Sequence, residues 1–193
     1  MIIVICGPEA SGKMTVGQEL EKNFNFHLLY NHQVIDLVGT VFDKEHIGDL
    51  WDMKEWHFSL ISSIFKSFLI SAIDNNENLV FTITWNFNNP ALVQFFQNLE
   101  LYAKKNNTKI LFVELFSTLE ERIKRNSTSN RLEHKVCKRN IENSTKALIE
   151  ATNDFQLNSF EKMPFEDWLI IDNTNLLPQE VANKIINYIY EKL

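Results

Sequence analysis

The residues with the clearest chemical meaning lie in one short segment near the start of the chain. Residues 7–15 read G-P-E-A-S-G-K-M-T, which fits the pattern GxxxxGK from Gly7 to Lys13. In such a loop the backbone N–H groups and the next helix N-terminus face an anion, and the lysine adds a full charge. The segment therefore predicts a site for a triphosphate such as ATP, with these binding residues: Gly7, Pro8, Glu9, Ala10, Ser11, Gly12, Lys13, Met14 and Thr15.

Glycine is scarce in this chain, which strengthens the interpretation of the loop. Of five glycines, three are Gly7, Gly12 and Gly17, and none follows Gly48. Glycine permits positive φ and a close approach of the backbone to a ligand. Two glycines at the required positions therefore indicate selection for backbone geometry. The alternative is an ordinary strand-to-helix turn with a surface lysine.

The elements that must position this loop alternate between short apolar runs and amphipathic segments. Strands are expected at 1–6, 26–30, 79–85, 110–116 and 168–171. Helices are expected at 14–24, 54–74, from Pro90, at 118–125, at about 141–157 and from Pro178, whereas 126–140 are polar and basic without a clear period. Short apolar strands separated by helices predict an α/β fold of three layers, in which helices cover both faces of a five-stranded parallel sheet. No linker divides the chain, so a single domain over 1–193 is expected.

Composition narrows the possible partners. The net charge of −6 and the pI of about 5.4 argue against a nucleic-acid binder. Two cysteines, Cys6 and Cys137, provide neither a disulfide framework nor a paired metal-ligand spacing. The apolar start of the chain lacks the basic region of a signal peptide, and no run approaches the roughly 18 apolar residues of a membrane span. We expect a cytoplasmic protein that acts on a small molecule, with no nucleic acid and no membrane; the oligomeric state cannot be read from the sequence.

Two further segments resemble parts of a known family. Residues 118–126, T-L-E-E-R-I-K-R-N, resemble the start of a lid, and residues 170–181, I-I-D-N-T-N-L-L-P-Q-E-V, resemble a fifth strand and a loop that touches adenine. Together with the loop, whose G-K-x-T ending is similar to that of adenylate kinase, they make the whole chain resemble the P-loop small-molecule kinases. This group includes nucleoside monophosphate, shikimate and gluconate kinases and antibiotic phosphotransferases.

The resemblance implies ATP and Mg²⁺ as cofactors, a small lid at about 118–140 and an acceptor-binding region at about 31–74. The lid cations of the family match Arg122, Arg125 and Arg131 most closely, with Arg139 a weaker match. Such cations stabilise the charge that spreads over a transferring phosphoryl group. The alternative for Arg122 is a solvated helix face paired with Glu120 or Glu121, and the alternative for Arg131 is a plain surface role.

The expected metal site follows from Met14, which stands where a serine or threonine usually follows the lysine. Methionine cannot hold Mg²⁺, but Thr15 has a hydroxyl in the position of the adenylate kinase threonine. In that family phosphate oxygens and water hold most of the metal shell. Thr15 is therefore expected to be at most one direct ligand.

The acceptor should lie at the carboxyl ends of the strands. Asp36, after the second strand, is the best available general base, with a helix-surface carboxylate as the alternative. Asn31, His32 and Trp85 are candidate substrate contacts; packing roles are the alternatives for His32 and Trp85. Trp51 and Trp56 either wall the acceptor pocket or belong to the core. The expected catalytic set is Lys13, Asp36, Arg122, Arg125 and Arg131.

Two departures from the family keep other functions open. The third strand ends in T-I-T-W-N, without the aspartate of the monophosphate kinases, and Y-N-H-Q-V-I-D after the second strand lacks both T-G-D-x-x-R and D-x-D. Transfer of the γ-phosphate of ATP to a small acceptor is the favoured function. The alternatives are a nucleotide-binding ATPase or switch, and a degenerate kinase that binds nucleotide without transferring phosphate.

Overall fold

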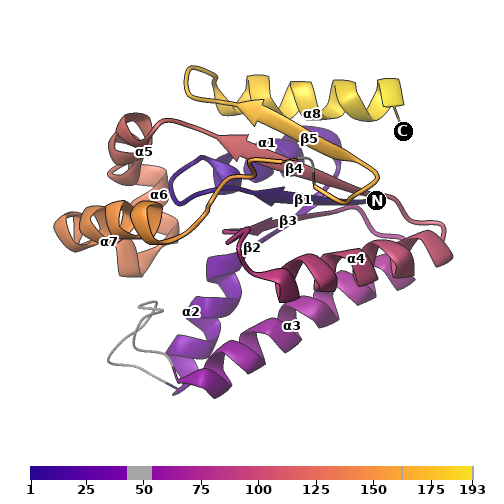
Figure 1. Cartoon of the computed structure of the whole chain (residues 1–193), viewed down its shortest axis with the longest axis horizontal. Helices are drawn as coiled ribbons and strands as arrows, with labels where there is room; N and C mark the ends of the chain where they lie inside the picture. Colours follow the sequence, from indigo (N-terminus) through magenta and orange to yellow (C-terminus); the bar gives the residue numbers. More distant parts are fainter. Residues whose placement is uncertain (43–53, 162, 193) are drawn as a thin grey trace.

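The computed structural model describes residues 1–42, 54–161 and 163–192, and its centre is a five-stranded parallel sheet (Figure 1). The strand order is β2-β3-β1-β4-β5. The strands are β1 (Ile2–Cys6), β2 (His27–Tyr30), β3 (Leu79–Ile83), β4 (Ile110–Phe116) and β5 (Trp168–Asp172). The α/β fold expected from the alternating pattern is confirmed.

The central strand β1 is buried along its whole length because helices cover both faces of the sheet. Its side chains alternate between two cores: Ile2 and Val4 face one layer, and Ile3 and Ile5 face the other. The first layer contains α2 (Asn31–Phe42), α3 (Glu55–Asp74) and α4 (Pro90–Lys105). The second contains α1 (Lys13–Phe24) and α8 (Pro178–Lys192) (Figure 1).

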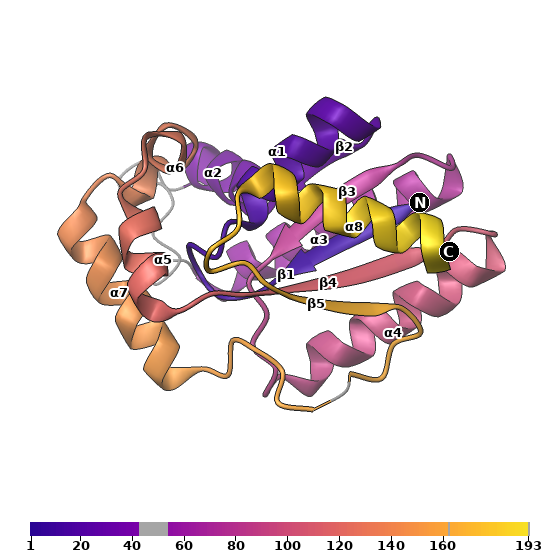
Figure 2. The ribbon, with the colours of Figure 1, turned by 90° about the horizontal axis from the view of Figure 1, so that it is seen from above.

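A third group of helices lies beyond the carboxyl ends of the strands (Figure 2). It consists of α5 (Leu119–Asn126), α6 (Ser129–His134), the 3-10 turn η2 (Val136–Lys138) and α7 (Ile141–Asp154). Thr118 caps α5 by accepting a hydrogen bond from the Glu121 N–H, and Asn140 caps α7 in the same way at Asn143. This group occupies the end of the sheet at which ligands bind in open parallel folds.

Three local differences from the sequence-based expectation have physical causes. The strand β3 ends at Ile83 rather than at residue 85, because Trp85 turns into the aromatic core. The helix α2 follows β2 without an intervening loop, so no turn signal marked its start. The helix α6 lies in the segment expected to be irregular, since its six residues contain one apolar side chain, Leu132, and so show no apolar period.

By length and composition alone, α3 is the one helix within the described residues that is apolar enough to cross a membrane. The sequence had been expected to contain no such stretch. Ile61, Leu69 and Ile73 of this helix are buried against the sheet. A helix that packs on a sheet can pass the same test, so this finding is weak evidence for a span.

Candidate nucleotide-binding and phosphoryl-transfer site

The phosphate loop connects the end of β1 to the start of α1, and both of its glycines have positive φ. Gly7 has φ 139° and Gly12 has φ 92°. A Cβ at Gly7 would lie 2.5 Å from the carbonyl oxygen of Leu115 in β4, so no larger residue fits there. Gly12 is the left-handed N-cap of α1, and the first N–H groups of a helix have no partner within it and so can bind an anion. The geometry of an anion cradle is therefore present.

Lys13 is the buried cation of this cradle. Its Nζ donates to the carbonyl oxygens of Gly7 at 2.7 Å and Pro8 at 2.6 Å. Burial lowers the pKa of Lys13 to about 7, although the neighbouring Glu9 carboxylate raises it. The ammonium thus lies inside the loop, where an added negative charge would restore its proton affinity.

A pocket of about 380 Å³ opens beside the loop and is lined by three parts of the chain. The loop and the start of α1 supply one wall, including Lys13 and Thr15. The lid helices supply cations to a second wall, and the segment between β5 and α8 supplies Leu176, Leu177 and Pro178. One end of the pocket is therefore cationic and the other has an apolar lining.

Arg125 joins the second and third of these walls. Its Nη2 donates to the carbonyl oxygens of Asn173 at 2.8 Å and Thr174 at 3.0 Å, and its Nε donates to Glu121 at 2.9 Å. The planar guanidinium is thereby fixed at the pocket's edge next to the β5–α8 segment. The expectation that Arg125 belongs to the site agrees with this position.

Arg131 brings a second lid cation to the loop. It is buried in α6, donates from Nε to Asn126 Oδ1 at 2.9 Å, and has its Nη2 3.9 Å from Glu9. Burial alone would raise the pKa of Glu9, but Lys138, Arg131 and Lys13 together lower it, so this carboxylate stays ionised. Arg131 lines the pocket and is no surface residue.

Arg122, by contrast, does not line the pocket. Its guanidinium is buried and donates to Thr152 Oγ1 of α7 at 3.2 and 3.1 Å. The alternative of an exposed pair with Glu120 or Glu121 is wrong, because Lys124 and Arg125 take those partners. Arg122 therefore ties α5 to α7. Arg139 is exposed and donates to the Leu132 carbonyl, away from the pocket lining.

The acceptor-side candidates are distributed differently from expectation. Asp36 and His32 lie one turn apart on α2, with Asp36 Oδ1 3.7 Å from His32 Nδ1, and neither lines the pocket. Burial lowers the pKa of His32 to about 4, so its imidazole is neutral at pH 7. Asn31 is half-buried at the start of α2.

The tryptophan candidates need a correction. Trp85 is fully buried and stacks on Phe96 with ring centroids 4.7 Å apart, within a core that also holds Trp168. It has no surface to offer a substrate ring, so its role is packing. Trp56 is 47% exposed and meets Phe42 edge-on, whereas Trp51 lies outside the described residues.

Several residues near the site could not be identified from the sequence. Lys135 lines the pocket, and burial together with Arg131 and Lys13 lowers its pKa well below the usual value. Lys138 lies 3.5 Å from Glu9. Asn126 is fully buried and also donates to Ser144 Oγ at 3.0 Å, so it connects α5, α6 and α7. The only signal for the lysines was the basic composition of residues 126–140.

The polar groups of the pocket fit a nucleotide with its metal ion. Ser11 Oγ and Asn173 Oδ1 are buried without a hydrogen-bond partner beside the loop, so the hydroxyl can donate to or accept from a ligand and the amide oxygen can accept. The one carboxylate in the lining, Glu121, is engaged by Arg125. Thr15, at the start of α1, lines the pocket and has a hydroxyl oxygen that can ligate a metal ion. Met14 beside it is almost fully buried.

No family model and no curated protein matches the sequence. The fold, however, is close to that of solved structures. A provisionally assigned kinase from Chloroflexus aurantiacus j-10-fl aligns with a TM-score of 0.67 at 13% identity, over 100% of this chain and 97% of that one. A gluconokinase from Sinorhizobium meliloti 1021 gives 0.57 at 13% identity, over 98% and 95%.

Shikimate kinase from Acinetobacter baumannii, solved in complex with shikimate, gives a TM-score of 0.55 at 16% identity, over 100% of this chain and 94% of that one. At these identities the likeness concerns the fold. Each chain is matched over nearly its whole length. This protein therefore has the fold of the P-loop small-molecule kinases of the shikimate and nucleoside monophosphate kinase-like group.

Proposed function

We propose that this chain is a phosphotransferase that moves the γ-phosphate of ATP to a hydroxyl or phosphate group of a small molecule. The observation that carries the proposal is the convergence of cations from separate elements on one phosphate loop. Lys13 comes from α1, Arg125 from α5 and Arg131 from α6, and all three line the same pocket. Lys135 adds a fourth cation from the segment after α6.

The pocket's two ends support a fixed orientation of the nucleotide. The phosphates would lie in the loop, against the N–H groups at the start of α1 and the Lys13 ammonium. The base would lie between the Arg125 guanidinium and the apolar segment of Leu176 and Leu177, since a flat cation and aliphatic side chains suit a planar heterocycle. In this orientation the γ-phosphate faces the lid cations.

The chain's own residues would act mainly through charge and position. Phosphoryl transfer passes through a loose transition state whose charge spreads over the equatorial oxygens, so fixed cations such as Lys13 and Arg131 contribute more than a base. Mg²⁺ bound with the nucleotide would neutralise phosphate charge; Thr15 would supply at most one ligand, with water and phosphate oxygens completing the shell. The proposal does not require Asp36 as a base.

A second candidate is a protein that binds nucleotide without transferring phosphate. The observation that favours it is the end of β3, where Thr82 lines the pocket and neither Ile83 nor Asn86 is acidic. The metal-orienting carboxylate of many kinases is therefore missing at that position.

One assay separates the candidates: ADP release from Mg–ATP, measured alone and with a library of sugar acids, nucleoside monophosphates, shikimate and aminoglycosides. Acceptor-dependent ADP release is the result expected for the phosphotransferase. ADP release at the same rate with and without every acceptor would indicate an ATPase instead. ATP binding without any turnover would assign a degenerate kinase, and absence of ATP binding would overturn the nucleotide site itself.

We also propose a cytoplasmic location and small-molecule rather than nucleic-acid partners. The net charge of −6 supports this, because a polyanion would be repelled by the protein as a whole. The lid cations point into a pocket and are offset by Glu9 and Glu121, so they do not form an open basic stripe.

A further inference from the structure

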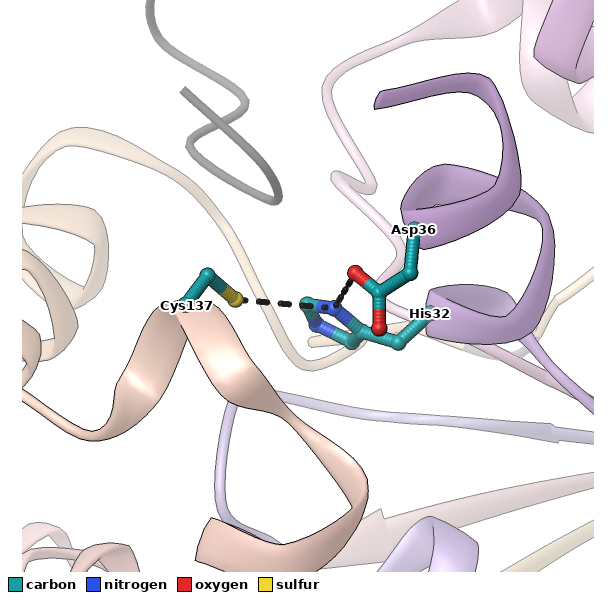
Figure 3. A group of neighbouring side chains, drawn as sticks. All are labelled: His32, Asp36 and Cys137. Atoms are coloured by element: carbon teal, nitrogen blue, oxygen red, sulfur yellow. Dashed lines mark hydrogen bonds and ion pairs between the residues drawn. The ribbon is translucent and has the colours of Figure 1, made fainter. Parts of the chain in front are cut away.

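Three metal-binding side chains converge outside the nucleotide pocket (Figure 3). His32 and Asp36 project from one face of α2, and Cys137 reaches them from η2, although it is 105 residues from His32 in the sequence. One ligand atom from each residue lies within 4.8 Å of the other two. None of the three lines the pocket beside the phosphate loop.

The geometry suits coordination rather than covalent catalysis. Asp36 Oδ1 lies 3.7 Å and Cys137 Sγ 3.8 Å from the same imidazole nitrogen, Nδ1 of His32 (Figure 3). A nucleophilic relay needs the thiol and the carboxylate on opposite ring nitrogens. In tetrahedral zinc sites the bond lengths place ligand atoms about 3.3–3.6 Å apart. The two separations from His32 Nδ1 exceed this by a few tenths of an ångström, and the Cys137 and Asp36 ligand atoms lie within 4.8 Å of each other.

One of the three side chains has a buried oxygen atom without a hydrogen-bond partner. Asp36 Oδ1 is shielded from solvent and accepts no hydrogen bond, which is costly for a carboxylate oxygen. A cation between the three side chains would satisfy it. A nitrogen, an oxygen and a sulfur ligand form the donor set of zinc, whereas Mg²⁺ prefers oxygen ligands only. The ion at this site would therefore differ from the one that accompanies the nucleotide.

The charges around the cluster also fit a divalent ion. The Asp36 carboxylate and a Cys137 thiolate would together cancel its charge, and neutral His32 adds none.

We propose that His32, Asp36 and Cys137 form a three-ligand site for Zn²⁺ with an open fourth position. The site joins α2 to η2, which directly follows the helix that carries Arg131. A bound ion would thereby hold the lid against the acceptor side of the fold. This inference does not depend on the proposed phosphotransferase activity, because it is tested without nucleotide.

The test is zinc affinity of the full chain, chelator-treated and reduced, measured by competition with a chromophoric chelator. The expected result is one equivalent of Zn²⁺, with affinity lowered roughly tenfold or more in both Cys137→Ser and Asp36→Asn. His27→Gln and Cys6→Ser are the matched controls, because they remove an exposed histidine and the other thiol and should leave the affinity unchanged. Co²⁺ should show thiolate charge-transfer absorption in wild type and lose it in Cys137→Ser.

A second measurement needs no variant and so remains decisive if a substitution prevents folding. Zn²⁺ at ten times its dissociation constant should slow alkylation of Cys137 by iodoacetamide about tenfold, as read by mass spectrometry of the wild-type protein. An unchanged alkylation rate would overturn the site. Equal zinc affinities for wild type and Cys137→Ser, or a Co²⁺ spectrum without thiolate absorption, would do the same.

Discussion

Lys13 is buried, with its ammonium inside a loop of backbone carbonyls and near other cations. Its partners are the carbonyl oxygens of Gly7 and Pro8, and burial lowers its pKa to about 7. Bringing a triphosphate into the loop would give the ammonium an anion in place of neutral dipoles. The residue thus connects the loop's geometry to its proposed ligand.

The first prediction is that Lys13→Ala weakens ATP binding by about 100-fold or more, which corresponds to roughly 2.7 kcal/mol. The reason is the loss of the full charge at the phosphates. The measurement is a calorimetric titration with Mg–ATP, with circular dichroism to confirm the fold. Lys124→Ala is the matched control, because Lys124 is exposed and pairs only with Glu120. Equal ATP affinities for wild type and Lys13→Ala would rule out the phosphate site.

The second prediction concerns pH. The pKa of Lys13 is about 7 in the folded protein and 10.5 as an ordinary side chain, so the unfolded chain binds more protons between these values. The free energy of unfolding contributed by Lys13 therefore rises with pH across this window, by at most about 1.4 kcal/mol per pH unit. Below pH 7 both states are protonated and the contribution is constant.

Urea unfolding at several pH values between 7 and 10 measures this effect, and Lys13→Met is its control. The comparison is needed because burial also lowers the pKa of Lys135, which acts in the same direction. The difference in unfolding free energy between wild type and Lys13→Met should grow with pH in favour of wild type. A difference that stays constant from pH 7 to 10 would contradict the lowered pKa.

At the scale of elements, buried polar side chains connect the helices of the lid. Asn126 accepts a hydrogen bond from Arg131 in α6 and donates to Ser144 in α7, while Arg122 donates to Thr152 in α7. Buried polar networks fix one arrangement because each missing bond is costly. Arg131, the pocket cation of α6, is therefore positioned by Asn126, which does not line the pocket.

The third prediction is that Arg131→Ala lowers kcat at least tenfold while changing ATP affinity much less. A lid cation acts mainly in the closed transition state, so its loss should affect the rate more than ground-state binding. Steady-state kinetics with an acceptor and a separate ATP titration measure the two effects. Arg139→Ala is the control, because it removes an exposed arginine of the same segment that lies off the pocket. Equal losses in both quantities would indicate a simple binding role.

The strands and long helices could be predicted from the sequence because their apolar periods are strong. The bounds of β4 agree with the expected 110–116, and α1 begins within one residue of the expected start. The apolar periodicity gave the wrong secondary structure where tertiary packing determines it. Trp85 continues an apolar run but leaves the strand for an aromatic core, and α6 has no apolar face to signal a helix.

The site could be predicted only where its residues are neighbours in the sequence. The phosphate loop was recognisable because Gly7, Gly12 and Lys13 lie within seven positions. The zinc-ligand cluster was not, since His32 and Cys137 meet only after the lid folds over α2. Arg122 was expected among the lid cations because of the family resemblance, whereas in the structure its guanidinium donates to Thr152 of α7.

At the scale of the whole molecule, the phosphate loop lies where the sheet, the segment that leads to α8 and the lid meet. Gly7 touches β4, Gly12 lies near Asn173 of the β5–α8 segment, and Arg125 reaches the Ser11 carbonyl from α5 at 3.5 Å. A ligand in the pocket would therefore contact the sheet, α1 and the lid at once. Its binding energy should be distributed over the entire domain.

The last prediction follows from this arrangement: the chain should unfold in one cooperative transition, which Mg–ATP shifts as a whole. At a ligand concentration of 100 times Kd the stabilisation is about 2.7 kcal/mol, which for a domain of this size raises Tm by about 5–11 °C. Scanning calorimetry with and without Mg–ATP measures the shift. Lys13→Ala should unfold in the same single transition, and Mg–ATP should not shift it. If the lid were an independent unit, a second transition would appear that the nucleotide leaves in place. That result would contradict both the single domain over 1–193 and the placement of the lid cations at the phosphates.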